Sequence, residues 1–227
     1  MLIKKRPSWA LPHSEVTPES VYLNRRQFMS GTLAVAAGLS VPGLLSAAKL
    51  PVPGEALDFV PMPGFSTDEE KTPFEDVTRY NNFYEFGTGK GDPAKYADEM
   101  TVDPWSVVVE GACDRPGAYA LEDLLKPHEY QERVYRLRCV EAWSMVIPWI
   151  GIPLADILKR LEPTSRAKYV YFETLYDPDQ MRGQRSLFST IDWPYQEGLR
   201  MDEAMNELSF LAVGLYGKTM PNQNGAP

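Results

Sequence analysis

Cys139 is the side chain with the most distinctive chemistry, because its segment, residues 136–143, also carries two arginines, a glutamate and a tryptophan. In an oxidising compartment this thiol could join Cys113, closing a loop of about 26 residues and stabilising the fold by ~3 kcal/mol. It could also be a buried, inert thiol, since free cysteine packs as a small hydrophobe. As a thiolate it could bind a soft metal, which Arg136 and Arg138 would favour. The segment alone leaves these three chemistries open.

A metal held by Cys139 must bring most of its own ligands. The chain has two histidines, His13 and His128, and two cysteines. These cannot form a four-ligand zinc site from Cys and His, nor a haem with two histidine ligands in the folded body.

Composition excludes other classes of protein. The 227 residues are 44% hydrophobic and 24% charged, which is typical of a globular chain with a core. Acidic side chains outnumber basic ones by 31 to 23, giving a net charge of −8. Because nucleic-acid binders neutralise phosphates with lysine and arginine, we expect no nucleic acid as a partner.

The elements around Cys139 follow from hydrophobic periodicity. Residues 134–140 alternate as a strand, with Tyr135, Leu137 and Cys139 on its apolar face and Cys139 at its end. Residues 153–161 have the spacing of an amphipathic helix. Further strands and short helices are expected at 105–111, 121–125, 168–176, 202–206 and 210–216. Their irregular alternation predicts an α+β fold.

The first 48 residues are typical of an export signal. Arg25 and Arg26 precede an uncharged stretch that ends at the small residues before Lys49. This pattern resembles a twin-arginine signal, which predicts export of the folded protein to the periplasm by the twin-arginine machinery and cleavage near Ala48. The alternative is an uncleaved membrane anchor, since about 20 residues can span a bilayer.

We expect two further parts in the exported chain. Residues 49–80 contain five prolines and an acidic cluster, so helix or central strand is improbable and an extended arm is predicted. Residues 81–227 form the predicted domain.

Three blocks carry a resemblance to a known family: residues 80–87, residues 138–144 and the tail 221–227. Together they resemble the sulfite-oxidase-like molybdenum family, in its branch of periplasmic enzymes that reduce methionine sulfoxide in proteins. The resemblance implies mixed sheets with short helices. Because the family continues past this tail with phosphate-binding residues and more sheet, it also implies a C-terminally truncated sequence.

The resemblance implies a molybdenum held by one pyranopterin (Mo-molybdopterin) and by a protein thiolate, matched by Cys139. The positions that match pterin-binding residues are Asn81, Tyr84, Glu85, Thr174 and Asn224. Short amides and hydroxyls suit the edges of a pterin. Taken without the resemblance, the two asparagines could be turn residues and the threonine an ordinary strand residue.

The implied activity is reduction of free and protein-bound methionine sulfoxide, with electrons from a quinone-linked, haem-containing membrane partner. Glu141 could donate a proton if burial beside Trp143 raises its pKa, or could pair structurally with Arg136 or Arg138. The alternatives are a related enzyme acting on sulfite or on small S- and N-oxides, or an exported binding domain closed by a Cys113–Cys139 disulfide.

Overall fold

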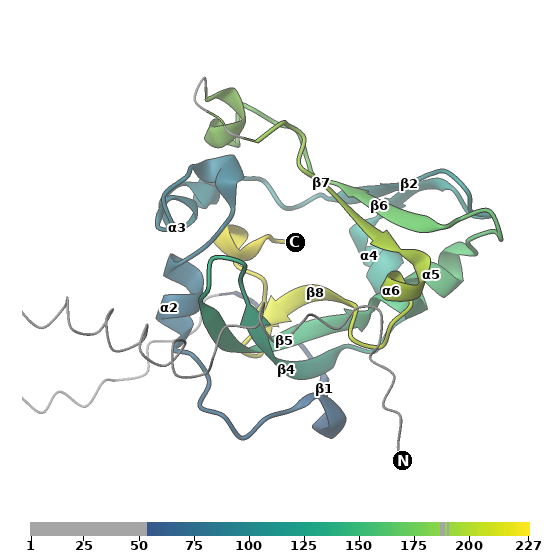
Figure 1. Ribbon diagram of the computed structural model, residues 1–227, viewed down its shortest axis with the longest axis horizontal. Helices are drawn as coiled ribbons and strands as arrows, with labels where there is room; N and C mark the ends of the chain where they lie inside the picture. Colours follow the sequence, from purple (N-terminus) through teal and green to yellow (C-terminus); the bar gives the residue numbers. More distant parts are fainter. Residues whose placement is uncertain (1–53, 187–188, 190) are drawn as a thin grey trace, which may run out of the picture. The chain divides into compact units, whose positions relative to one another are not determined.

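A computed structural model describes residues 54–186, 189 and 191–227 (Figure 1). The predicted signal segment, with Arg25, Arg26 and the cleavage site at Ala48, lies outside the described residues. Within the described part, no helix is long and apolar enough to cross a membrane.

A five-stranded sheet, in the order β1-β4-β5-β8-β9, forms the centre of the described fold. All neighbouring strands are antiparallel except β1 and β4. The sheet strands are β1 (Val60–Pro61), β4 (Gln131–Arg138), β5 (Ser144–Pro153), β8 (Phe210–Leu215) and β9 (Lys218–Thr219). The hairpin of β4 and β5 closes at the pair Arg138 and Ser144, so the loop between them is residues 139–143.

Two antiparallel ribbons complete the strands, one of β2 (Ser106–Val109) with β3 (Gly117–Ala120), the other of β6 (Tyr169–Glu173) with β7 (Gln196–Arg200). Figure 1 shows both ribbons on the side of the sheet where α4, α5 and α6 lie. The α+β class expected from the sequence is confirmed.

The helices are short. The α-helices are α2 (Phe74–Arg79), α3 (Asp92–Tyr96), α4 (Leu121–Leu125), α5 (Leu154–Leu161) and α6 (Met201–Ala204). The 3-10 helices are η2 (Pro63–Phe65), η3 (Tyr84–Phe86), η4 (Ala97–Glu99), η5 (Arg182–Arg185) and η6 (Asn222–Asn224).

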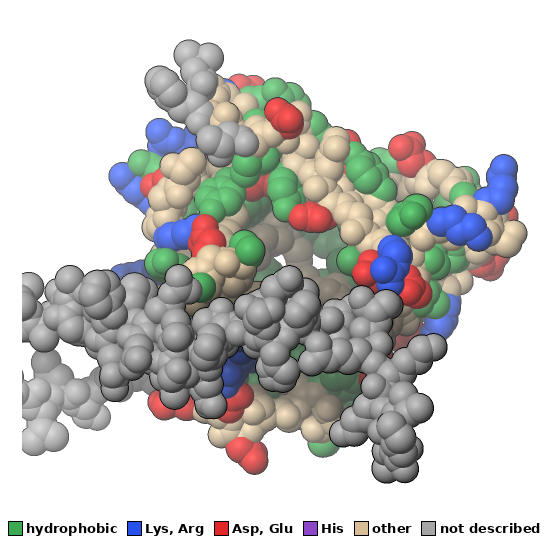
Figure 2. Space-filling model, viewed as in Figure 1, with side chains coloured by type: hydrophobic (Ala, Val, Ile, Leu, Met, Phe, Trp, Pro, Cys, Tyr) green, Lys and Arg blue, Asp and Glu red, His purple; other side chains and the backbone are tan. Residues whose placement is uncertain are grey.

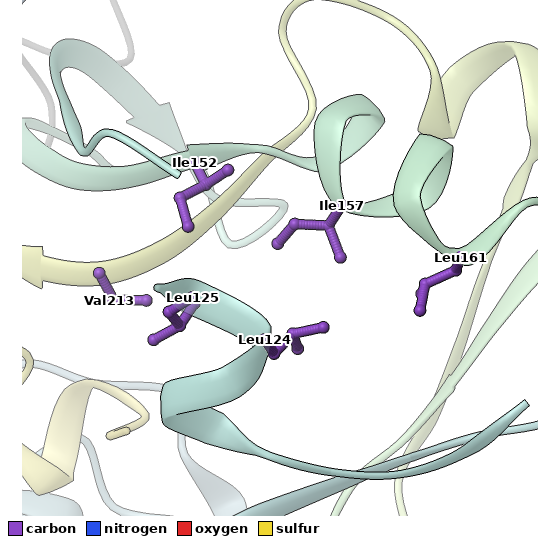
Figure 3. Packing of buried hydrophobic residues seen from close by; sticks show 6 residues of the cluster. All are labelled: Leu124, Leu125, Ile152, Ile157, Leu161 and Val213. Atoms are coloured by element: carbon purple, nitrogen blue, oxygen red, sulfur yellow. The ribbon is translucent and has the colours of Figure 1, made fainter. Parts of the chain in front are cut away.

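The main core cluster packs α4 and α5 against the sheet. Its side chains come from two helices and two strands and point toward one another (Figure 3). They are Leu124, Leu125, Ile152, Ile157, Leu161 and Val213. Because α5 buries the face that carries Ile157 and Leu161, burial of an apolar stripe explains this helix.

The expected helices and strands are present, with shifted ends. The helix at 121–125 coincides with α4, and α5 begins one residue after Pro153, which is its N-cap. The strand expected at 134–140 runs from Gln131 to Arg138, so Cys139 is the first residue beyond it.

The expectation of no helix in residues 49–80 is wrong for the last part of that range, where α2 forms. Pro73 stands at the N-cap of α2, which needs no backbone N–H there, and Val77 is buried on its inner face. Between residues 54 and 72 the regular elements are the two-residue strand β1 and the single turn η2, as proline density predicts. A helix as short as α2 can still form after the last proline when one of its faces is buried.

Removing the Ile157 side chain should lower the free energy of unfolding. Ile157 is 4% exposed, so Ile157→Ala leaves a cavity, and we expect a loss of about 2–4 kcal/mol in urea denaturation. Lys159→Ala, on the exposed face of the same helix, should change the value by less than about 0.5 kcal/mol. Equal losses in the two variants would contradict this packing.

Candidate functional site

Cys139 lies in the turn that joins β4 to β5. Its backbone N–H donates to the Trp143 carbonyl at 2.9 Å, and its carbonyl accepts from the Ala142 N–H at 3.1 Å. Ala142 has φ 70°, in the left-handed region that a residue with a side chain adopts at a cost. The turn therefore holds the thiol at a fixed place beyond the strand end.

Two N–H groups point at the Cys139 sulfur. The Asn82 side-chain amide donates to Sγ at 3.2 Å, and the Glu141 backbone N–H lies at 3.5 Å. These two donors orient the sulfur, as neighbouring hydrogen bonds do for a metal ligand.

Cys139 opens onto a cavity of about 470 Å³. Its walls come from α2, the segment before η3, the β4–β5 hairpin and η6. Of the residues expected from the sequence to bind a cofactor, the walls include Asn81, Glu85, Cys139, Thr174 and Asn224. Ligand cavities in proteins have this size. Figure 2 shows that the face seen in Figure 1 is hollowed near the C-terminal end, with hydrophobic side chains on the rim.

Asn81 and Asn224 share one backbone acceptor. Both side-chain amides donate to the Val77 carbonyl, at 3.1 and 3.0 Å. The carbonyl is available because Val77 lies near the C-terminal end of α2, where helical carbonyls lack partners, and because the Asn81 N–H donates to Lys90 instead. This bond fixes both amides.

The same arrangement leaves two buried acceptors unused. The Oδ1 atoms of Asn81 and Asn224 are both buried without a hydrogen-bond partner. A buried unpaired carbonyl is costly, so a ligand that donates hydrogen bonds in this cavity would relieve both atoms.

Glu85 and Thr174 form a second polar pair on the wall. Glu85 is 5% exposed, and its carboxyl is hydrogen-bonded to Thr174. Burial raises the pKa of Glu85, against the opposing effect of its hydrogen bonds. Thr174 itself follows β6 and is tied to the Tyr195 carbonyl.

Glu141 belongs to a charged network outside the cavity wall. It accepts from Lys90 Nζ at 2.7 Å, from Trp143 Nε1 at 3.1 Å and from the Tyr84 hydroxyl at 3.0 Å. These bonds lower the pKa of Glu141 to about 2, and the bond from Lys90 contributes most. The expectation that burial raises this pKa is therefore wrong, because Glu141 is solvent-accessible and paired with a cation.

The structural alternative for Glu141 also named the wrong partners. Arg136 pairs with Glu69, and the cation on Glu141 is Lys90, which lies 51 residues earlier in the chain. Tyr84 lines a neighbouring cavity of about 700 Å³, and its hydroxyl contacts Glu141 and Lys90, so its contact with a pterin stays a prediction.

The expected alternative of a disulfide is contradicted. Cys113 and Cys139 are both free thiols. The backbone of Cys113 pairs with that of Pro163, just after α5, in an isolated β-bridge. Cys139 lies in the hairpin loop. The reading as a binding domain closed by this disulfide is excluded with it.

The sequence does not single out Asn82 and Lys90, which contact the thiol and its loop. Asn82 lies next to Asn81 in residues 80–87, but an exposed asparagine has no distinguishing sequence signal. Lys90 lies in a glycine-rich turn, and nothing in the sequence links it to residue 141.

Comparison with known proteins decides the family. The model of the oxidoreductase molybdopterin binding domain matches residues 94–227. The protein-methionine-sulfoxide reductase catalytic subunit MsrP of Pseudomonas syringae pv. tomato is 54% identical over 240 residues, covering 100% of this chain and 71% of that protein. The subunit of the same name from Xanthomonas campestris pv. campestris is 54% identical over 98% of this chain and 68% of its own.

The chain belongs to this molybdopterin-binding family. Within it, the similarity places the chain among the catalytic subunits of protein-methionine-sulfoxide reductases. The cofactor of the family is molybdopterin. A solved structure, the sulfane dehydrogenase SoxCD of Paracoccus pantotrophus, is similar at a TM-score of 0.43 and 14% identity, covering 60% of this chain and 34% of that one.

The residues present fit such a cofactor. In the described part of the chain, no group of three His, Cys, Asp or Glu could hold a metal ion by itself. A pterin that brings its own sulfur ligands needs only one thiolate from the protein, and its edge N–H groups match the unpaired Oδ1 atoms of Asn81 and Asn224.

Relief of the left-handed backbone at Ala142 should stabilise the hairpin. Ala142 is exposed, so Ala142→Gly removes little packing and should raise the free energy of unfolding by about 1 kcal/mol. Ala142→Val should lower it by about 1–2 kcal/mol, since a β-branched side chain tolerates this region less well.

Urea denaturation measures the free energy of unfolding of both variants. Val140→Ala, in the same turn, is the control and should change this free energy by less than about 0.5 kcal/mol. A loss of stability in Ala142→Gly would contradict the strained turn.

The buried carboxyl of Glu85 should make stability depend on pH. Its folded pKa lies above its unfolded value, so the stability present below the unfolded pKa is lost as the pH rises through the folded pKa. Glu85→Gln removes this loss. The difference between variant and wild type in free energy of unfolding should therefore grow in favour of the variant from pH 4 to pH 7. Parallel pH curves would show that Glu85 gains no proton on folding.

Proposed function

We propose that the protein is a molybdenum-dependent reductase of methionine sulfoxide, free and in oxidised proteins, and that it works in the periplasm. In this proposal Cys139 supplies the protein ligand of the metal, and Asn81, Glu85, Thr174 and Asn224 hold the pterin. The observation that supports it best is the pair of buried, unpaired amide oxygens of Asn81 and Asn224, two residues that line the cavity onto which Cys139 opens.

The reaction removes one oxygen atom from a sulfoxide. With two electrons and two protons, the products are a sulfide and water. When bound, the cofactor would supply a redox-active metal for oxygen-atom transfer. The chain's own residues position the thiolate: the turn 139–143 fixes Cys139, and the N–H groups of Asn82 and Glu141 face its sulfur.

Glu141 has a different role from the proton donor first expected. With its pKa near 2, it is a carboxylate at neutral pH and accepts hydrogen bonds from Lys90, Trp143 and Tyr84. In this proposal it fixes the loop that carries Cys139.

The charge of the site favours a neutral substrate. At the turn that carries Cys139, Lys90 is already paired with the Glu141 carboxylate. Sulfite, the substrate of the rival enzyme, is an anion and would meet this carboxylate near the sulfur. A sulfoxide is neutral and is not repelled by it.

Exposure of the cysteine turn supports access by protein substrates. Val140, next to Cys139, is completely exposed, and Leu137 and Tyr80 near the cavity are 40% and 44% exposed. A methionine sulfoxide in a polypeptide can therefore reach the turn without entering a deep tunnel. Accessible apolar surface also suits substrates of varied sequence.

Electrons must come from another protein in this proposal. The relatives are named catalytic subunits, which implies a partner subunit. We propose a haem-containing membrane protein linked to quinone, as the family resemblance implies. Export of the folded, loaded protein by the twin-arginine machinery would follow from the segment 1–48.

Replacement of Cys139 tests the function directly. Cys139→Ser should abolish methionine-sulfoxide reduction with a reduced viologen dye and should lower molybdenum content, measured by elemental analysis of the purified full chain. Cys113→Ser is the matched control. It should keep both the reductase activity and the molybdenum content, because Cys113 lies away from the cavity.

A wild-type protein that holds molybdenum but acts on sulfite and not on methionine sulfoxide would favour the rival enzyme. Full activity in Cys139→Ser would refute the proposed metal ligand.

A further inference from the structure

The Asn82 side chain bridges the reactive sulfur and a lysine. Its Nδ2 donates to Cys139 Sγ at 3.2 Å, while its Oδ1 accepts from Lys90 Nζ at 2.5 Å. An asparagine amide has a donor end and an acceptor end of nearly equal size, so either end could face the sulfur.

Lys90 removes this freedom. An ammonium group has three donors and no acceptor, so the amide end that faces Lys90 must be the carbonyl oxygen. The other end, which faces Cys139, must then be the NH₂ group. A flipped amide would place two donors together at Lys90 and a carbonyl oxygen against a negatively charged sulfur.

Lys90 is itself held in place by its neighbours. Besides Asn82, its Nζ donates to Glu141 at 2.7 Å and to the Tyr84 hydroxyl at 2.9 Å, so all three donors are used. The Lys90 side chain is 22% exposed, and these hydrogen bonds raise its pKa although burial opposes them. The ammonium is therefore charged and fixed.

We propose that Lys90 is a positioning residue that locks the Asn82 amide with its N–H toward the Cys139 sulfur. The proposal rests on the proposed function, in which this sulfur holds the metal. Hydrogen bonds to a thiolate ligand withdraw electron density from it and raise the reduction potential of the metal that it binds. The lock would thus set the potential at which the site is reduced.

The first measurement uses the apoprotein and needs no metal. In the wild type, the Asn82 side-chain NH₂ protons should show nuclear Overhauser contacts to the Cys139 Hβ protons. Lys90→Met should lose these contacts, because the amide is free to turn. Lys90→Arg, which again offers only donors, should keep them. Contacts that persist in Lys90→Met would show that Lys90 does not fix the orientation of the Asn82 amide and would overturn the proposal.

The second measurement is the reduction potential of molybdenum in the loaded full-length protein. Lys90→Met should lower the potential while molybdenum content stays at the wild-type level, and Lys90→Arg should restore it. Asn82→Leu removes the hydrogen bond itself and should lower the potential as well.

The double variant separates the lock from a simple charge effect. If Lys90 acts through Asn82, adding Lys90→Met to Asn82→Leu produces no further shift. Additive shifts would show that the lysine acts by its charge alone and would overturn the proposal. Failure of the proposed function would look different: the wild type would bind no molybdenum, while the amide contacts in the apoprotein would still decide the lock.

Discussion

One backbone carbonyl organises the candidate site. Val77, near the end of helix α2, accepts hydrogen bonds from both Asn81 and Asn224, which are far apart in the chain. The bond fixes both amides and leaves their carbonyl oxygens buried and unpaired beside the cavity of Cys139. Polar groups left unpaired in a core are costly, and proteins keep them where a ligand completes the pairing.

A second constraint acts on the other side of the thiol. The hairpin turn with its left-handed Ala142 places Cys139 just beyond β4, and the network of Lys90 and Glu141 holds the turn and the Asn82 amide. Asn81, which is expected to contact the cofactor, and Asn82, which contacts the thiol, are neighbours in the segment between α2 and η3. The amides of Asn81 and Asn224 line the cavity, whereas the charged pair of Lys90 and Glu141 does not.

The sequence predicts most of this fold but less of the site. Alternation places Cys139 at a strand end, because a half-buried strand leaves a period of two in the sequence. Helix α2 escapes detection, since it is short and follows a proline-rich stretch, yet it supplies Val77. The partner of Glu141 escapes for another reason: Lys90 meets it only through tertiary structure, so the direction of the Glu141 pKa could not be predicted from neighbouring residues.

X-ray absorption at the molybdenum edge tests the central claim most directly. In the loaded wild-type protein, the spectrum should contain a sulfur neighbour of the metal that disappears in Cys139→Ser and is retained in Cys113→Ser. A metal environment that does not change when Cys139 is replaced would contradict the account, because the cavity, the turn and the amides would then surround a thiol that binds nothing.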